Sequence, residues 1–553
     1  MTRQRSRYAN AGGCVLQSRG GVPESWGLPI SAQARPFMFI RVWSSATHGV
    51  DALPIEIETN VSSGMRDYTV VGLPTGAVRE SLDRIFAALD NAGYSQPRGR
   101  VTINLAPADV PKESAAFDLP LAIGLIAAES GRLAPSMLSS HWVMGELSLD
   151  GSVRPVRGVL PMTIKARDHG CKGVLVPAEN APEAAVVEGM DVYSIETLQD
   201  AIRVFDEGEA VASSVIYEEP AECDTHRQVR SMLDFRDVRG QDNAKRALEV
   251  AAAGGHNVLL VGPPGSGKTM LARRMPGVLP RLQRTEALET TKIHSVAGRL
   301  DASTGIVVKR PFRCPHHTIS DAGLCGGGAF PKPGEISLAH NGVLFLDELP
   351  EFKRRVLEVM RQPIEEGRIT ISRARSTVTY PARFMLIASM NPCPCGHLTD
   401  PQRECVCAPA QVQRYLSKLS GPLMDRIDLH VEVAPVSFDE MDGPRVGCSS
   451  EAVRDRVEAA RDVQARRFEE HPEIHCNAQM GSRLLEEHCT IEERGRALLK
   501  SAIERIGLSA RAYTRILKVA RTIADLEAST AIDSRHVSEA VQYRALDREW
   551  WHG

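Results

Sequence analysis

The feature that most limits the fold of this chain is a glycine-rich turn between an apolar segment and a helix-forming one. Residues 257–261 read Asn-Val-Leu-Leu-Val and residues 270–273 read Met-Leu-Ala-Arg, which predicts a buried strand followed by the start of a helix. The turn between them consists of Gly262, Pro263, Pro264, Gly265, Ser266, Gly267, Lys268 and Thr269. Glycines let backbone N–H groups point at phosphate oxygens, and the helix N-terminus adds partial positive charge. The pattern predicts an α/β core with a phosphate-binding loop, in which Lys268 reaches the β- and γ-phosphates and Thr269 holds Mg²⁺.

A second apolar segment ends in two carboxylates. Residues 342–348 read Gly-Val-Leu-Phe-Leu-Asp-Glu, which predicts a strand that ends at the ligand-binding edge of a parallel sheet. There Asp347 is suited to hold Mg²⁺ through water, and Glu348 is suited to orient and deprotonate the attacking water. An acidic strand end that opens a surface helix is the alternative, and the phosphate loop upstream argues against it.

Two more polar residues follow apolar segments of the same region. The strand predicted over residues 382–389 leads to Asn391, which is placed to hydrogen-bond the γ-phosphate or the attacking water. Arg426 is predicted to act in trans, where it would stabilise transition-state charge in the site of a neighbouring subunit. A salt bridge from Arg426 to Asp425 or Asp428 is the alternative.

Length and composition bound the remaining possibilities. A chain of 553 residues is too long for one core, so about two to four domains are expected. Hydrophobic residues make up 43% and charged residues 24%, and no apolar run reaches the ~18 residues of a membrane helix. We therefore expect a cytoplasmic protein without a membrane partner. The net charge of -3 gives no overall signal for nucleic acid, so such a partner would be met by local basic patches.

Changes in pattern along the chain predict five consecutive regions. These are an extension over 1–37, an α+β domain over 38–211, a charged linker over 212–236, an α/β nucleotide-binding core over 237–449 and a helical lid over 450–553. The extension is a disordered tail, a transit peptide or the result of a mis-assigned start. In the α+β domain, helical spacing predicts a helix over 77–92, and a nearly all-apolar stretch predicts a buried helix over 117–129.

The α+β domain resembles a known fold at residues 145–151, Gly-Glu-Leu-Ser-Leu-Asp-Gly, and at residues 176–180, Val-Pro-Ala-Glu-Asn. Both segments are similar to the proteolytic domain of Lon-type proteases, which has a ribosomal-protein-S5-like fold. The resemblance implies where the Ser–Lys dyad of such a protease would lie. The nucleophile position falls on Ala116, and the segment 157–162, which should carry the lysine, has none.

Without nucleophile or base, the Lon-like domain is predicted to be a degenerate scaffold that does not hydrolyse peptides. A shifted dyad, in which Ser114 pairs with Lys112 or Lys165, is the alternative.

Four cysteines lie close together in the sequence after Asn391. They are Cys393, Cys395, Cys405 and Cys407. Four sulfurs suit tetrahedral Zn²⁺, which favours a structural metal clip, although C-x-C pairs are tighter than the usual C-x₂-C spacing. His397 could replace one ligand, and four reduced thiols on a structured loop remain the alternative.

Two stretches of the nucleotide-binding region are basic and carry an aromatic residue. Positive charge of this kind on two loops of one core favours contact with a polyanion, by phosphate pairing and base stacking. Solvated loops with ordinary charge are the alternative. The residues proposed to contact DNA are Lys309, Arg310, Phe312, Arg313, His316, His317, Arg373 and Arg375.

From residue 450 onward the pattern is helical, with amphipathic segments over 459–469, 491–506 and 511–527. Arg511 or Arg515 could reach the γ-phosphate from this predicted lid. A solvated helix face is the alternative for both.

Three segments of the sequence are distinctive enough to point to one protein family. They are residues 311–318, Pro-Phe-Arg-Cys-Pro-His-His-Thr; residues 333–340, Pro-Gly-Glu-Ile-Ser-Leu-Ala-His; and residues 391–396, Asn-Pro-Cys-Pro-Cys-Gly. With the phosphate loop, they resemble the AAA+ ATPases of the magnesium-chelatase-like ComM/YifB family, from residue 38 nearly to the C-terminus. The resemblance implies an ATP- and Mg²⁺-dependent homohexameric ring that acts on single-stranded or branched DNA, as a branch migration helicase in recombination or natural transformation. It also implies that Val238 and Gln241 line the adenine pocket.

Two other functions stay open. One is a chelatase-type or chaperone-like remodelling ATPase that acts on a protein partner, and the other is an ATP-dependent protease, which the missing dyad disfavours. The residues alone indicate a Mg²⁺-dependent NTPase with inserted basic loops.

Overall fold

The computed structural model describes residues 38–74, 76–109, 112, 114–207, 215, 233–301, 305–328, 331–373, 376–436, 440, 442 and 447–546. The interpretation of residues 1–37 and most of the predicted linker fall outside this part of the chain.

The first region is built on a seven-stranded mixed sheet with the strand order β3-β4-β2-β1-β5-β8-β9. A long antiparallel hairpin of β1 (Met38–His48) and β2 (Asp51–Ser62) forms its centre. The other strands are β3 (Asp67–Val71), β4 (Arg100–Ala106), β5 (His141–Val143), β8 (Gly173–Pro177) and β9 (Asp191–Ile195). A separate short ladder joins β6 (Glu146–Leu147) to β7 (Val153–Arg154).

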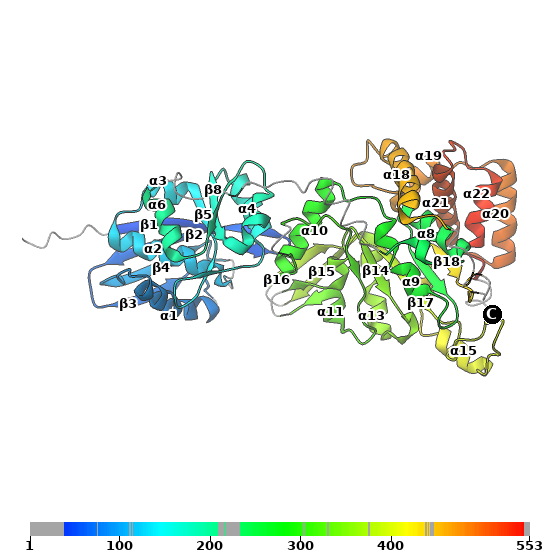
Figure 1. Ribbon diagram of the computed structural model, residues 1–553, viewed down its shortest axis with the longest axis horizontal. Helices are drawn as coiled ribbons and strands as arrows, with labels where there is room; N and C mark the ends of the chain where they lie inside the picture. The colour runs from blue at the N-terminus through cyan, green and yellow to red at the C-terminus, as the bar shows by residue number, and fades with distance from the viewer. Residues whose placement is uncertain are drawn as a thin grey trace, which may run out of the picture. The chain divides into compact units, whose positions relative to one another are not determined.

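Helices of this region pack on the mixed sheet (Figure 1). They are α1 (Gly76–Asn91), α2 (Asp118–Ser130), α3 (Pro135–Ser140), α4 (Val159–Asp168), α5 (Ala181–Ala185) and α6 (Leu198–Glu207). The predicted buried helix is confirmed as α2, whose residues from Asp118 to Ala128 are all buried. Helix α2 packs on both β1 and β2 and on α1, so apolar residues are needed all round it.

The second region contains a five-stranded parallel sheet with the order β11-β14-β17-β10-β18. Its strands are β11 (Phe312–Arg313), β14 (Val343–Leu346), β17 (Met385–Met390), β10 (Val258–Val261) and β18 (Leu429–Glu432). Every residue of β10, β14 and β17 is buried, as expected for a parallel sheet covered on both faces. Because the strands are parallel, the segments that follow β10, β14 and β17 meet at one edge of the sheet.

The helices of this core precede and follow its strands. They are α8 (Asp242–Gly254), α9 (Lys268–Ala272), α10 (Arg284–Ala297), α13 (Arg354–Val359), α14 (Arg361–Glu366), α15 (Pro409–Leu416) and α16 (Gly421–Met424). The chain adds two further pieces to this core. The first contains α11 (Asp321–Cys325), β12 (Gly326–Gly327), β13 (Lys332–Pro333) and α12 (Glu335–Leu338). The second is a hairpin of β15 (Arg368–Arg373) and β16 (Ser376–Pro381).

The chain ends in a group of helices, drawn in orange and red in Figure 1. They are α18 (Ser450–Arg467), α19 (Ser482–His488), α20 (Glu493–Ile506), α21 (Ala510–Leu526) and α22 (Ser534–Gln542). Apolar residues of α18, α21 and α22 belong to the same hydrophobic core as those of α8, β10 and β18, and α18 and α21 pack on α8, which contacts β18. Among the described residues, no helix is long and apolar enough to cross a membrane.

Candidate nucleotide site

The phosphate loop leaves the buried strand β10 and runs into α9 at the carboxyl edge of the parallel sheet. A Cβ atom at Gly262 would lie 2.2 Å from the carbonyl oxygen of Val433, so only glycine permits this close approach of two backbone segments. Lys268 points back into the loop, where its Nζ donates to the carbonyl oxygens of Gly262 at 2.7 Å and Pro263 at 2.9 Å. Lys268 is therefore held against the loop, and its contact with nucleotide phosphates stays a prediction.

The ammonium group of Lys268 also lies 3.2 Å from the Asn391 side-chain oxygen, beyond the end of β17. Burial lowers the pKa of Lys268 to about 8, against the raising effect of the nearby Asp347 and Glu348 carboxylates. The structure thus brings together a cation and an amide that the sequence places far apart.

Asp347, directly after β14, lies beside the start of α9. Its Oδ2 accepts a hydrogen bond of 2.8 Å from the Thr269 hydroxyl, and its Oδ1 accepts one from Ser389 on β17. A hydroxyl and a carboxylate oxygen in contact are the donor set that Mg²⁺ takes beside nucleotide phosphates, so these residues fit the cation. Ser389, which holds the carboxylate, was not singled out in the sequence, where it is one more residue of an apolar strand.

Glu348 follows Asp347 in a left-handed backbone conformation, with φ of 55°. A non-glycine residue in this region is strained, and such strain is typical of functional sites. The Glu348 side chain is exposed, and its Oε2 lies 3.5 Å from Nδ1 of His317. His317 in turn contacts the ring of Phe352 edge-on, at 6.4 Å between centroids. The structure therefore places His317, predicted to contact DNA, next to the predicted catalytic carboxylate.

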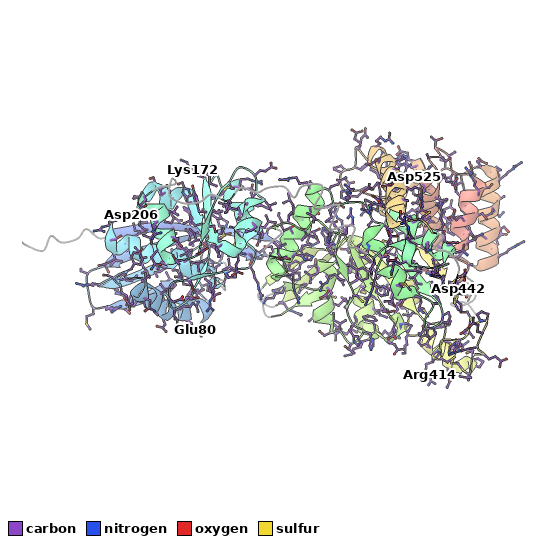
Figure 2. The ribbon with its side chains drawn as sticks, viewed as in Figure 1. Glu80, Lys172, Asp206, Arg414, Asp442 and Asp525 are labelled. Carbon is purple, nitrogen blue, oxygen red and sulfur yellow. The ribbon has the colours of Figure 1, made fainter. Side chains whose placement is uncertain are left out.

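A cleft of about 550 Å³ opens beside Glu348 and Asn391. Its other wall includes Arg414, Tyr415 and Lys418, from α15 and the residues that follow it. Figure 2 shows Arg414 on this helix.

The two residues predicted for the adenine pocket lie on the segment that precedes α8. Val238 is buried, and its carbonyl oxygen accepts from Lys245 at 2.6 Å. The Gln241 amide donates to the carbonyl oxygens of Ala434 at 2.5 Å and Ser266 at 3.4 Å, which ties the segment to the phosphate loop. Their contact with adenine stays a prediction.

The predicted arginines differ in their surroundings. Arg426 is 5% exposed, forms an ion pair of 2.6 Å with Glu365, and donates to the carbonyl oxygen of Pro422. A salt bridge was the alternative for Arg426, and the structure shows one, though with a different carboxylate from the two considered. Arg515 pairs with Asp428. The Arg511 side chain is 59% exposed, 4.0 Å from an Asp425 oxygen, and so remains accessible to a neighbour.

The proposed DNA-contacting residues near β11 are held within the fold. Arg310 pairs with Glu286 at 2.9 Å and is 13% exposed, and Arg313 makes a two-pronged contact with Glu335 at 2.5 and 2.7 Å. Phe312 stacks on Phe345 of β14, with ring centroids 6.0 Å apart. In this conformation these three side chains contact internal partners, and their contact with DNA stays a prediction.

Of the other residues proposed for DNA, His316 contacts His317 with the two rings tilted and their centroids 4.1 Å apart, and Lys309 is half-buried. Arg373, at the end of β15, is exposed, with one guanidinium nitrogen close to Gly327 of the neighbouring β12–β13 segment. Arg375 lies outside the described residues.

The predicted metal ligands converge. The Sγ atoms of Cys393, Cys395, Cys405 and Cys407 all lie within 4.8 Å of one another. His397, the substitute ligand considered, instead pairs with Asp400 through Nδ1 at 2.9 Å.

In the first region, Ser114 acts as a helix cap. Its hydroxyl oxygen accepts from the Ala116 N–H at 3.1 Å, and the Lys112 ammonium donates to the carbonyl oxygen of Pro107. A serine hydroxyl that caps a 3₁₀-helix is oriented by the backbone, which gives no support to the shifted dyad.

Three family models match the chain in order. Magnesium chelatase, subunit ChlI, matches residues 234–441; subunit ChlI of Mg-chelatase matches residues 57–180; and the ChlI C-terminal model matches residues 447–544. The parallel sheet, its phosphate loop and these matches define a magnesium-chelatase-like protein of the AAA+ class.

Similar proteins identify the family within this class. Competence protein ComM of Haemophilus influenzae is 44% identical over 511 residues, which is 92% of this chain and 97% of that protein. The protein YifB of Salmonella typhimurium is 44% identical over 509 residues, with the same two shares covered. Lon protease 2 of Bacillus subtilis is 32% identical over 150 residues, or 25% of this chain and 26% of the protease. The chain belongs to the ComM/YifB family of magnesium-chelatase-like proteins.

Proposed function

We propose that this protein is an ATPase that works as a homohexameric DNA motor, a branch migration helicase in recombination or natural transformation. The observation that carries the ATPase part is the meeting of three strand ends at one sheet edge. There the Lys268–Asn391 pair, the Thr269–Asp347 pair and Glu348 lie together.

Each residue has a role that follows from its position. The backbone N–H groups of the loop and Lys268 hold the β- and γ-phosphates, and Asn391 orients the γ-phosphate or the water that attacks it. Glu348 accepts a proton from that water. Thr269 and Asp347 would hold Mg²⁺, which supplies charge neutralisation for the phosphates.

The motor part of the proposal rests on family membership and on surface charge. A relative that matches nearly full length is named a competence protein, which fits a role in DNA uptake or recombination. The exposed Arg373 and Lys332, on two elements that pack together, offer positive charge outside the nucleotide site. In a ring, the exposed Arg511, or Arg426 after release from Glu365, would reach the γ-phosphate of the adjacent subunit.

ATPase assays with and without single-stranded or forked DNA test the proposal. We expect DNA to stimulate turnover, Lys268→Ala to abolish nucleotide binding, and Glu348→Gln to bind nucleotide while hydrolysing it at least about 100-fold more slowly. Full activity in Glu348→Gln would contradict the assigned base. An intact ATPase that neither binds DNA nor responds to it at modest salt would contradict the motor.

A protein-remodelling ATPase is the second proposal. The Lon-like α+β region at the N-terminus favours it, because such a domain could hold a polypeptide without cleaving it. A co-purifying protein that raises ATP turnover in the absence of DNA would support this function over the motor. An ATP-dependent protease is less favoured, since Ser114 serves as a backbone cap. Casein degradation lost in Ser114→Ala would revive it.

A further inference from the structure

The segment that joins β17 to α15 carries an arrangement of thiols that nucleotide hydrolysis alone does not require. The Sγ of Cys393 lies 3.3 Å from that of Cys395 and 3.6 Å from that of Cys405, and the Cys395 and Cys405 sulfurs are 3.6 Å apart. The backbone N–H of Cys395 also donates to the Cys407 sulfur at 3.4 Å. These separations are too long for disulfides, and all four cysteines are free.

The distances match those of a metal–thiolate centre. A tetrahedral zinc with Zn–S bonds of about 2.3 Å places its sulfurs about 3.8 Å apart. The donor set is four sulfurs, which suits Zn²⁺ and excludes the hard cations that prefer oxygen. His397 is engaged with Asp400 and leaves the four thiols as the set.

The loop itself has little else to hold it. Residues 391–408 form no helix or strand, and eight of these eighteen residues are exposed, with Val406 at 86% between two of the cysteines. Ordering each residue of a loop costs about 1–2 kcal/mol of backbone entropy. A long loop without secondary structure therefore needs an interaction, such as a cross-link, that offsets this cost. Convergence of four sulfurs in such a loop is the geometry that a metal supplies.

The loop also touches the nucleotide site. Cys393 is two residues beyond Asn391, whose side chain contacts Lys268. At the other end of the same turn, a Cβ at Gly396 would lie 2.6 Å from a side-chain carbon of Pro264, so the turn packs directly on the phosphate loop. Pro394 lines the cleft beside Glu348.

We propose that the thiolates of Cys393, Cys395, Cys405 and Cys407 bind one structural Zn²⁺, and that this centre positions Asn391 and the phosphate loop. Binding forms four Zn–S bonds and releases the four thiol protons to solvent, with no change of oxidation state. The cysteines are positioning residues, since none of them contacts the nucleotide space. The metal site stands on its own geometry, and the positioning role rests on the proposed ATPase.

Metal analysis of the full-length protein, purified without chelator, tests the metal site. One zinc per chain is expected, released by a mercurial that titrates the thiols, and replaceable by Co²⁺ with the visible absorption of a tetrahedral thiolate site. Cys393→Ser and Cys405→Ser should lose the zinc, whereas Cys448→Ser, at an exposed cysteine outside the cluster, should keep it. A protein with four freely titrating thiols and no metal, with disulfides, or with iron in place of zinc overturns the proposal.

The positioning role has a separate readout. In Cys405→Ser we expect KM for ATP to rise about tenfold or more while Cys448→Ser matches the unsubstituted protein. Cys405→His, which restores a zinc ligand, should recover both the metal and KM. Zinc loss with unchanged KM and kcat would overturn the positioning role. Zinc bound to a protein without ATPase activity would instead overturn the proposed function and leave the metal site in place.

Discussion

Lys268 is a lysine with little water around it. Its side chain is 8% exposed, and in place of solvent it has two carbonyl oxygens of the loop and the Asn391 amide oxygen. Burial disfavours the charged form, which is why its pKa falls to about 8. A nucleotide would reverse this, because phosphate oxygens next to the ammonium group favour the charged form.

Nucleotide binding should therefore take up a proton above the pKa of Lys268. At pH 8.5 we expect net proton uptake on binding, and at pH 6.5 none from this group. Affinity should fall as pH rises past about 8, approaching tenfold per unit, since the neutral amine must first be protonated. Titration calorimetry in two buffers of different ionisation enthalpy measures the uptake.

A guanidinium stays charged throughout this range, so Lys268→Arg, if it binds nucleotide, should show no such uptake. Equal proton release or uptake by both proteins at pH 8.5 would contradict the assignment to Lys268.

Residues at the nucleotide site could be predicted because their signals are local. The Lys268 and Asp347 positions follow from one strand and one turn each, and parallel strands bring such ends together. The role of Arg313 depends on Glu335, and that of Arg310 on Glu286, partners more than twenty residues away in sequence. Only the tertiary fold shows that each of these cations is paired with a carboxylate. The contact of His317 with Glu348 also joins residues far apart in the sequence, so it could not be predicted from a local pattern.

At the scale of elements, the β15–β16 hairpin carries exposed positive charge that could contact DNA in the proposed function. Ile369 and Ile371 point inward, and Thr370 and Thr379 face outward as an exposed cross-strand pair at 3.0 Å. Tyr380 anchors the hairpin by donating to the carbonyl oxygen of Pro331 at 2.6 Å, next to Lys332. The packing of this hairpin against the β12–β13 segment joins residues more than thirty positions apart, so it follows from the tertiary fold and not from a local pattern.

Substitution of one arginine on this hairpin should weaken DNA binding without changing the ATP site. For Arg373→Ala we expect a similar loss of affinity on all DNA sequences and a salt slope reduced by about 1, as for the loss of one phosphate contact. Fluorescence anisotropy with labelled single-stranded DNA over a range of salt concentrations measures both quantities.

Arg368→Ala is the matched control, because Arg368 is exposed at the opposite end of β15 and pairs with Glu366 at 3.4 Å. An unchanged salt slope in Arg373→Ala would remove this hairpin from the proposed DNA surface.

At the scale of the whole molecule, a buried ion pair joins the parallel sheet to the helices that follow it. Asp428, just before β18, is 4% exposed; it accepts from the Asn257 N–H at 2.8 Å and pairs with Arg515 of α21. Burial alone would raise the pKa of Asp428, but Arg515 and His256 outweigh it and hold that pKa below its ordinary value. The stabilisation is therefore present above the unfolded pKa of about 3.9 and is lost as pH falls through the folded one.

Removal of the arginine should leave an unpaired buried charge. We expect Arg515→Ala to lower the free energy of unfolding by about 3 kcal/mol at neutral pH, measured by urea denaturation. Arg511→Ala, four residues earlier on α21 with an exposed side chain, should change it by no more than about 0.5 kcal/mol. Equal stability of both variants would mean that solvent already screens the Asp428 pair.

One apolar core runs from β10 and β18 through α8 into α18, α21 and α22, and the side chain of Asp525, labelled in Figure 2, ties two of these helices by pairing with Arg467. A close-packed interior of this kind is stiff. We therefore expect the sheet and these helices to move as one rigid body. If the protein forms the proposed ring, rotations that accompany nucleotide hydrolysis would then take place at the contacts between subunits rather than inside each subunit.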